Sequence, residues 1–244
     1  MYRITYRIKN RKINEVHSLL GYRLIMLSQN ILVLFKGMII MKKELKDMTN
    51  EELWTLFPII IESHNPNWKN TYYEEKKVIE KIIGSHNIER ISHYGSTAVP
   101  NLLEKPIIDI LIEIKADIDI EKLISSMKGA GYIYSPQPNN PAPHMMFLKG
   151  YTLNGFKGQV YHIHVRYLGD WDELYFRDYL LSHPNVVEEY GKLKLSLKQS
   201  YEHDRDGYTN AKTDFIKKAT KLAKEEVRKM KVIGSHNNED NLFM

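Results

Sequence analysis

The sequence predicts one α/β or α+β domain, with a small mixed β-sheet flanked by helices and a helical C-terminal extension. Helical periodicity comes first, between residues 48 and 83. Short apolar and β-branched runs, interrupted by one helix, follow between residues 88 and 167, and helical patterns fill most of the rest. At 244 residues the chain has room for one ordinary domain with a well-filled core, or for two small ones. We expect one domain.

Two helices are expected at the start of the domain. Thr49, followed three residues later by Glu52, is typical of a capping box, and apolar residues recur at helical spacing up to Ile61. A second helix spans residues 68–83 and ends at Gly84. The β-branched run over residues 107–114 is the clearest strand. Further strands are expected over residues 88–93, 132–134, 145–149 and 159–167, and further helices over residues 120–127, 171–181, 184–199 and 208–229.

The first 40 residues differ in composition from the remainder. They contain seven Lys or Arg and one acidic residue, Glu15, so the other residues hold 28 basic and 29 acidic side chains. Without this leader, the net charge gives no argument for a nucleic-acid partner. The apolar run over residues 24–35 is interrupted and too short to span a bilayer, and a signal peptide or anchor is the alternative reading. We interpret residues 1–40 as an over-extended gene start, with Met41 as the natural first residue, or else as a disordered N-terminal extension, and residues 232–244 as a flexible tail.

The chain contains no cysteine. This excludes a disulfide framework and thiolate metal sites, so nothing in the sequence indicates folding in an oxidising compartment. We expect a cytoplasmic protein that does not associate with membranes.

A Gly-Ser turn followed by an acid inside an apolar strand is the most informative pattern. Gly95 lets the backbone approach an anion, and Ser96 adds a hydroxyl and an N–H. Asp109 would present a carboxylate to a divalent metal that bridges phosphate oxygens. Alternatively, Asp109 hydrogen-bonds a turn, although an acid in a buried strand costs free energy unless it is paired or binds metal. Lys105 either reaches a phosphate as a point charge or lies in solvent.

The run Tyr161-His-Ile-His-Val-Arg166 is the second pattern. Strand alternation places His162 and His164 on one face, about 7 Å apart at their Cα atoms. Two such imidazoles can converge on a metal or a phosphate, and a solvent-facing pair on an edge strand is the alternative. Arg166 ends this strand, and like Lys105 it either reaches a phosphate or lies in solvent.

Together these motifs resemble a known family. Tyr94-Gly-Ser-Thr-Ala-Val-Pro, Lys105-Pro-Ile-Ile-Asp-Ile, the His-x-His strand and Phe176-Arg-Asp-Tyr-Leu-Leu-Ser-His-Pro184 resemble the GrpB family, over about residues 41–223. The order of Gly-Ser turn, spacer and strand-borne acid also resembles the nucleotidyltransferase superfamily. The resemblance implies that residues 41–231 form a nucleotidyltransferase-like domain. The chain departs from the family at Asn101, where glycine is usual, but asparagine tolerates positive φ.

What the resemblance implies is a protein that binds a nucleoside triphosphate with a divalent metal (Mg, Mn or Zn) and transfers a nucleotidyl group to an acceptor that the sequence does not name. Histidine would replace the third acid of the parent fold. Residues Arg177, Tyr208 and Lys212 either line the cleft or form salt bridges. The implied site consists of Gly95, Ser96, Thr97, Lys105 and Arg166 for the phosphates, and of Asp109, His162 and His164 for metal and catalysis, with Glu113 as a further metal candidate.

The pattern of acids leaves a non-catalytic alternative open. Two-metal sites of this superfamily take two acids spaced two residues apart, but the residues two positions before and two positions after Asp109 are Ile107 and Leu111. Glu113 lies roughly 13 Å from Asp109 along an extended strand, which favours a solvated strand end. The alternative is a module that senses a nucleotide or binds a partner protein, and a metal-dependent hydrolase is a third option. We expect a nucleotide or another phosphorylated small molecule as partner, and a homodimer is left open.

Overall fold

The structure is a computed structural model of the chain, and it describes residues 44–140 and 143–240, together with four short strands between residues 26 and 40. The chain divides into two units, residues 1–48 and residues 49–244. In the first unit, β1 (Met26–Leu27) pairs with β2 (Asn30–Ile31) and β3 (Val33–Phe35) with β4 (Met38–Ile40), both antiparallel, and η1 (Leu45–Asp47) follows. The interpretation of residues 1–40 as an over-extended gene start falls mostly on residues outside those described, and it stays a prediction.

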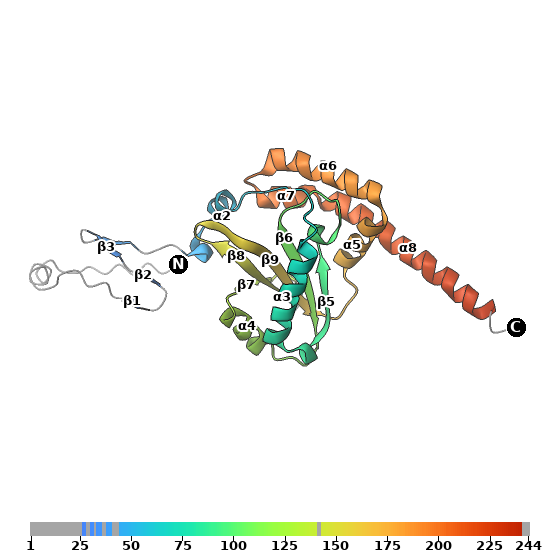
Figure 1. Cartoon of the computed structure of the whole chain (residues 1–244), viewed down its shortest axis with the longest axis horizontal. Helices are drawn as coiled ribbons and strands as arrows, with labels where there is room; N and C mark the ends of the chain where they lie inside the picture. The colour runs from blue at the N-terminus through green and yellow to red at the C-terminus, as the bar shows by residue number, and fades with distance from the viewer. Residues whose placement is uncertain are drawn as a thin grey trace, which may run out of the picture. The chain divides into compact units, whose positions relative to one another are not determined.

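A five-stranded mixed sheet forms the centre of the second unit, in the order β5-β6-β9-β8-β7 (Figure 1). Strands β6 and β9 are parallel neighbours, whereas every other neighbouring pair is antiparallel. This confirms the predicted mixed sheet flanked by helices. The strands are β5 (Ile88–Tyr94), β6 (Ile107–Ile114), β7 (Ile133–Pro136), β8 (Met145–Thr152) and β9 (Gly155–Tyr167).

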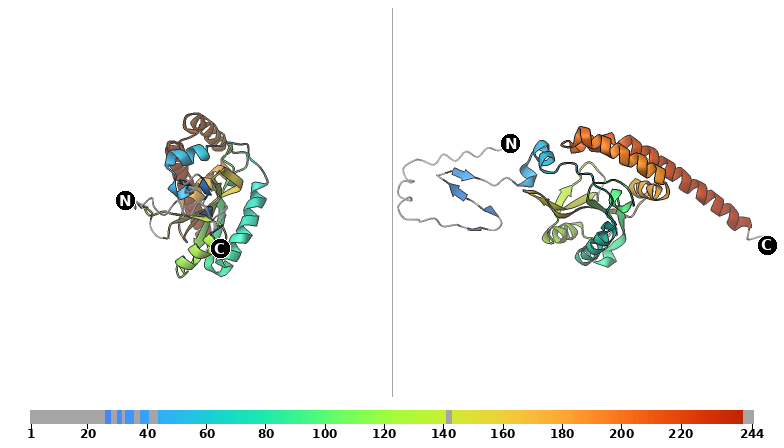
Figure 2. Two further views of the ribbon diagram at one scale, coloured as in Figure 1. Left: turned by 90° about the vertical axis from the view of Figure 1, so that its left-hand side faces the viewer. Right: turned by 45° about the horizontal axis from the view of Figure 1, so that its top comes forward.

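Helices cover both faces of this sheet (Figure 2). On one face, α3 (Trp68–Ile83) and α4 (Ile120–Gly129) pack against the isoleucines at even positions of β6, Ile108 to Ile114, and form the main core. The odd positions of β6, which include Asp109, point to the other face. Four helices follow the sheet: α5 (Asp172–Ser182), α6 (Pro184–Tyr201), α7 (Arg205–Ala211) and α8 (Thr213–Asp240).

Local sequence signals explain where the first helices begin and end. Thr49 caps α2 (Asn50–Leu56): the Glu52 N–H donates to Thr49 Oγ1 at 3.3 Å, and the Thr49 N–H donates to Glu52 Oε2 at 2.8 Å. Helix α3 has the predicted bounds and stops at Gly84, whose φ of 85° is open to glycine but strained for other residues. The predicted capping box and the second helix are therefore confirmed.

The first helix, the last helix and the strands β8 and β9 differ from the predictions by more than two residues. The first helix ends at Leu56 rather than near Ile61, because Pro58 disfavours helical backbone at the residue before it. The last predicted helix, over residues 208–229, is two helices. The first, α7, begins earlier than predicted because Asp204 caps it by accepting a hydrogen bond from the Gly207 N–H at 2.8 Å, and α8 follows it to Asp240. Strands β8 and β9 are longer than expected, because a tight turn joins Thr152 to its partner Gly155.

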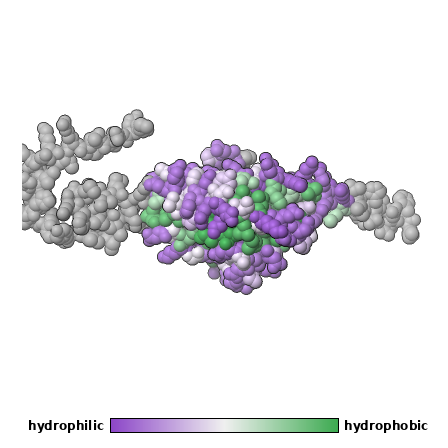
Figure 3. Space-filling model, turned by 90° about the horizontal axis from the view of Figure 1, so that it is seen from above, coloured by the Kyte–Doolittle hydropathy of each residue, from purple (hydrophilic) through white to green (hydrophobic). Residues whose placement is uncertain are grey.

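Hydrophilic residues dominate the surface on the side of α6, where a band of hydrophobic residues also reaches solvent (Figure 3). Large apolar side chains exposed on the C-terminal helices include Leu181 and Leu195. The homodimer left open by the sequence remains a prediction. In the part of the chain that the structure describes, no helix is both long and apolar enough to cross a membrane.

Candidate functional site

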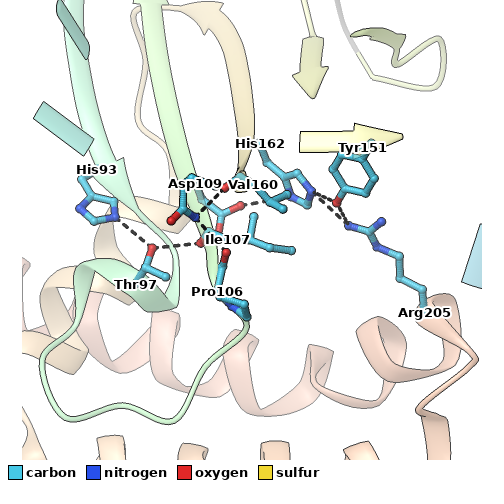
Figure 4. A network of polar contacts seen from close by, with 10 residues as sticks. His93, Thr97, Pro106, Ile107, Asp109, Tyr151, Val160, His162 and Arg205 are labelled. Carbon is cyan, nitrogen blue, oxygen red and sulfur yellow. Dashed lines mark hydrogen bonds and ion pairs between the residues drawn. The ribbon is translucent and has the colours of Figure 1, made fainter. Parts of the chain in front are cut away.

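The parallel pairing of β6 with β9 brings Asp109 and His162 together. The two residues are register partners, and the same register aligns Leu111 with His164 and Glu113 with Arg166. Because partners in a sheet share a face, Asp109 Oδ1 lies 3.4 Å from His162 Nδ1 (Figure 4). Asp109 and His162 therefore point to the same face of the sheet, as the predicted strand alternation requires, and β9 supplies the residue beside Asp109.

Two further side chains hold the other nitrogen of His162. Tyr151 Oη lies 2.6 Å and an Arg205 guanidinium nitrogen 3.2 Å from His162 Nε2, and the same Arg205 nitrogen lies 3.3 Å from Tyr151 Oη. A guanidinium only donates, so Nε2 accepts and the ring proton is assigned to Nδ1, from which it points to Asp109. Burial lowers the pKa of His162, which fits this neutral form.

The carboxyl of Asp109 stays ionised within this setting. Burial by itself would raise its pKa, but the hydrogen bond from His162, and the positive charge that His162, His164 and Lys105 carry when they are protonated, hold the pKa below its usual value. The Asp109 side chain keeps 25% of its surface exposed, so a ligand can reach the carboxylate.

Residue 95 must be glycine because its Cα lies too close to the Asp109 carboxyl for a side chain to fit. Its φ is 71°, and a Cβ at this position would overlap the Asp109 carboxyl group. The short 3₁₀ turn η3 (Ser96–Ala98) follows, and the Thr97 hydroxyl donates to the Ile107 carbonyl at 3.0 Å while also lying 3.0 Å from His93 Nε2. Thr97 therefore ties the Gly-Ser turn to β6, and its hydroxyl is engaged within the protein.

Three lysines surround a small cavity in front of this turn. Lys105, Lys194 and Lys212 line it with Ser96 and Asp109, and His162, Ile107 and Tyr208 complete the wall. Its volume is about 40 Å³, enough for a few water molecules. We call this space the lysine cavity.

The three lysines have no carboxylate within ion-pair distance among the residues that the structure describes, whereas Lys149 and Lys192, for example, are each paired with a glutamate. Lys194 Nζ donates to Ser96 Oγ at 2.8 Å, and Lys212 Nζ lies 4.4 Å from the Tyr208 ring centroid. Asp109 acts on all three ammonium groups at longer range, and Glu104 also acts on that of Lys194.

Burial has a large effect on these ammonium groups. It lowers the pKa of Lys105 and of Lys194 to about 7, and that of Lys212 to about 8. The nearby cations add to this lowering: Arg205 and Lys212 at Lys105, Lys212 at Lys194, and Arg205 at Lys212. An anion in the lysine cavity would reverse the effect and favour the charged form of each lysine.

Other candidates from the sequence lie apart from this cavity. Glu113 is fully buried and bonded to Arg90, with its Oε1 2.9 Å from an Arg90 nitrogen and 3.1 Å from the Gly169 N–H. Arg166 lies 2.7 Å from Glu173 and stacks over Trp171, 4.5 Å from its ring. Neither lines the lysine cavity.

His164 is close to Asp109 but does not contact it. Its ring meets Tyr94 edge-on, with centroids 5.7 Å apart, and its Nδ1 is buried without a hydrogen-bond partner. Burial lowers the pKa of His164 to about 4. Arg177, a cleft candidate, instead donates to the His93 carbonyl at 2.9 Å and pairs with Asp178.

Comparison with known proteins decides the family. The family model described as "GrpB protein" matches residues 58–222, which is more than half of the chain. The chain belongs to the GrpB family. Its similarity to the "Glutamate-rich protein GrpB" of Alkalihalophilus pseudofirmus is 36% identity over 162 residues, covering 65% of this chain and 91% of that protein.

Further proteins are similar to a comparable part of this chain. YqkA of Bacillus subtilis is 35% identical over 66% of this chain, which spans about half of that protein (46%). The crystal structure of conserved protein GrpB from Enterococcus faecalis matches with a TM-score of 0.59 and 30% identity, covering 69% of this chain and 99% of that one. The Cid1 poly(U) polymerase aligns at a TM-score of 0.37 and 14% identity, too distant a likeness to support an argument.

Sequence reasoning on this GrpB family member did not find Lys194, Arg205 or Tyr151. For Lys194 a signal exists: the buried residues of α6 are Val187, Tyr190, Gly191 and Lys194, so this lysine occupies a position of the apolar stripe. A lysine in a core-facing stripe indicates a buried ammonium group, which is kept in a protein mainly where it binds an anion or another polar group. Arg205 and Tyr151 give no comparable local signal, because only the tertiary fold brings them to His162.

Proposed function

We propose that this GrpB family member binds a nucleoside triphosphate, or a related phosphorylated small molecule, with a phosphoryl group in the lysine cavity. The observation that supports this most is the gathering of Lys105, Lys194 and Lys212 without ion-pair partners in the described part of the chain. Buried ammonium groups cost free energy unless an anion compensates them. A phosphoryl group carries the required charge and accepts hydrogen bonds from lysines and from Ser96.

The dimensions of the cavity define which part of the ligand it accepts. A volume of about 40 Å³ suits one terminal group rather than a whole nucleotide. The partly exposed Asp109 carboxylate borders the same space, so the neighbouring phosphates of a polyphosphate would lie beside Asp109. Gly95, whose backbone approaches Asp109 closely, shapes this border.

The oxygen atoms of the Asp109 carboxylate and of a bound phosphate are suitable ligands for a divalent cation. Among the described residues, no group of three or more His, Cys, Asp or Glu side chains is placed to hold a metal. Mg²⁺ needs no such group, since one carboxylate, water and substrate phosphates commonly complete its shell, whereas Zn²⁺ sites take three or four protein ligands. We therefore propose Mg²⁺ or Mn²⁺ held by Asp109, where it would neutralise charge on phosphate oxygens.

The role that follows for His162 is to position Asp109. Its Nδ1 proton points to the carboxylate and its Nε2 accepts from Arg205, so neither nitrogen offers a free lone pair to a metal. This contact favours the ionised form of the carboxyl and would help to orient it toward a cation.

Transfer of a nucleotidyl group is the catalytic form of this proposal, and a non-catalytic nucleotide-binding module is the second candidate. The second is favoured by Ile107 and Leu111, which occupy the positions where a two-metal site would need another acid. Release of pyrophosphate from a bound nucleotide, in the presence of candidate acceptors, separates the two candidates.

A thermal-shift screen tests the binding itself, because a ligand that binds only the folded state raises its melting temperature. ATP, CTP, GTP and UTP are each combined with Mg²⁺, Mn²⁺ or Zn²⁺. We expect at least one nucleotide–metal pair to raise Tm, and the rise to disappear in Lys194→Gln and Asp109→Ala. Lys192→Gln is the matched control, since Lys192 is exposed and paired with Glu188 on the same helix. Absence of a response to every pair would contradict the proposal.

A further inference from the structure

A second pocket adjoins the lysine cavity and differs from it in character. Its walls include Ile60, Phe156 and Val160, and its volume is about 230 Å³. It shares Lys105 and Ile107 with the lysine cavity, so the two spaces meet at these residues. We call it the apolar pocket.

The strand register relates the two spaces. Ile107 pairs with Val160 at the first step of the parallel β6–β9 pair, and Asp109 pairs with His162 two residues further on. Two residues along a strand correspond to about 7 Å. The apolar pocket therefore begins at a distance that a ligand extending from the phosphate subsite can cover.

One polar group within the apolar pocket is fixed in direction. Gln159 Nε2 donates to the Pro106 carbonyl at 2.9 Å and to the Val160 carbonyl at 3.1 Å. These two bonds use both amide protons, so Oε1 is the part of this side chain that can accept a hydrogen bond from a ligand. A single oriented acceptor among apolar walls is a common way to select and orient a ring with an N–H group.

We propose that the apolar pocket binds the purine or pyrimidine base of the phosphorylated ligand, with Gln159 Oε1 accepting a hydrogen bond from a ring N–H or amino group. Lys105 then lies between the base and the phosphate subsites. The volume is below the range of about 300–1,000 Å³ typical of drug-sized ligands and suits one ring system. This inference rests on the proposed function, since it assigns the remainder of the same ligand.

Comparison of ring-bearing and ring-free polyphosphates tests the inference. Isothermal titration calorimetry in Mn²⁺ measures Kd for tripolyphosphate and for ATP, CTP, GTP and UTP. We expect at least one nucleotide to bind tenfold or more tightly than tripolyphosphate. Ile60→Trp, which fills the pocket from a partly exposed position, should reduce this advantage below threefold and leave tripolyphosphate affinity unchanged.

Ile133→Trp provides the matched control, because Ile133 is 39% exposed on the edge strand β7 and lines neither space. Should Ile60→Trp fail to fold, Ile60→Asn replaces the apolar wall with a polar one and carries the same expectation. Equal affinity of tripolyphosphate and all four nucleotides in the unmodified protein would overturn the base pocket while leaving the phosphate site standing. No binding of either kind of ligand would overturn both.

Discussion

Asp109 and His162 are register partners on the parallel strands β6 and β9, with Asp109 Oδ1 3.4 Å from His162 Nδ1. Tyr151 and Arg205 hold the far side of the imidazole, so a chain of contacts runs from α7 to the carboxylate (Figure 4). This arrangement keeps one acid ionised at the border of the lysine cavity.

Asp109→Asn should separate cation binding from phosphate binding. The amide is nearly isosteric but neutral, so it removes the charge that attracts a divalent cation and leaves the lysines in place. We expect Mn²⁺ to strengthen nucleotide binding at least tenfold in the unmodified protein and less than twofold in Asp109→Asn, while metal-free tripolyphosphate binds the variant as well or better. Calorimetric titrations with and without Mn²⁺ measure this, and an undiminished Mn²⁺ effect in the variant would exclude Asp109 as its ligand.

Gly95→Ala should destabilise the fold and displace Asp109. At φ 71° the new methyl group would be strained and would overlap the Asp109 carboxyl, so we expect a loss of about 2–3 kcal/mol in the free energy of unfolding. Gly131→Ala is the control, because Gly131 has φ 91° but open space around its Cβ position, and we expect about 1 kcal/mol. Urea denaturation measures both, and equal losses would show that the contact with Asp109 is unimportant.

Glu104→Gln should alter the dependence of stability on pH. Glu104 is fully buried, its Oε1 lies 2.9 Å from His64 Nδ1, and its Oε2 has no partner; burial raises its pKa to about 9. The free energy of unfolding is therefore highest, with respect to this group, below its unfolded pKa near 4.5. It decreases as the pH rises from there through the folded pKa of about 9, because the unfolded state then loses its proton more readily. Glutamine is neutral in both states, so the variant should gain on the unmodified protein as pH rises from 5 to 9, by about 2 kcal/mol or more at pH 8. Chemical denaturation across this range checks the trend, and a difference independent of pH contradicts it.

Glu113→Ala should cost stability without affecting ligand binding. Removal of this carboxylate leaves Arg90 and the Gly169 N–H without their acceptor, which we expect to destabilise the fold by about 2–3 kcal/mol. Nucleotide affinity and its dependence on Mn²⁺ should stay within twofold of the unmodified protein. Denaturation and calorimetry measure the two properties, and a lost Mn²⁺ effect would return Glu113 to the metal site.

Local features of the fold could be predicted from the sequence because local chemistry determines them. The Thr49 capping box, the end of α3 at Gly84 and the β-branched strand β6 all follow from neighbouring residues. The end of the first helix could also have been predicted, since Pro58 is visible in the sequence, but the apolar spacing beyond it misled the prediction.

The candidate site was predictable only in part, because it is assembled from distant segments. The Gly-Ser turn and Asp109 lie in one stretch, whereas the pairing of β6 with β9 and the approach of α6 depend on tertiary packing. Lys194 shows which part of the site can be predicted. Its place on the apolar stripe of α6 predicts that it is buried, but its contact with Ser96 could not be predicted because the two residues are far apart in the chain.

Titration of tripolyphosphate into variants of the lysine cavity tests the central claim most directly. Calorimetry at pH 6.5 should show binding that weakens tenfold or more in Lys105→Gln and in Lys194→Gln, since each removes a charge-assisted hydrogen bond worth about 1.5–3 kcal/mol. Lys192→Gln should bind as the unmodified protein does. Binding by the unmodified protein should also weaken between pH 6.5 and pH 9, because the pKa values of the three lysines, about 7 to 8, lie within that range. Affinity that is the same in all three variants and at both pH values would contradict a phosphate site in the lysine cavity.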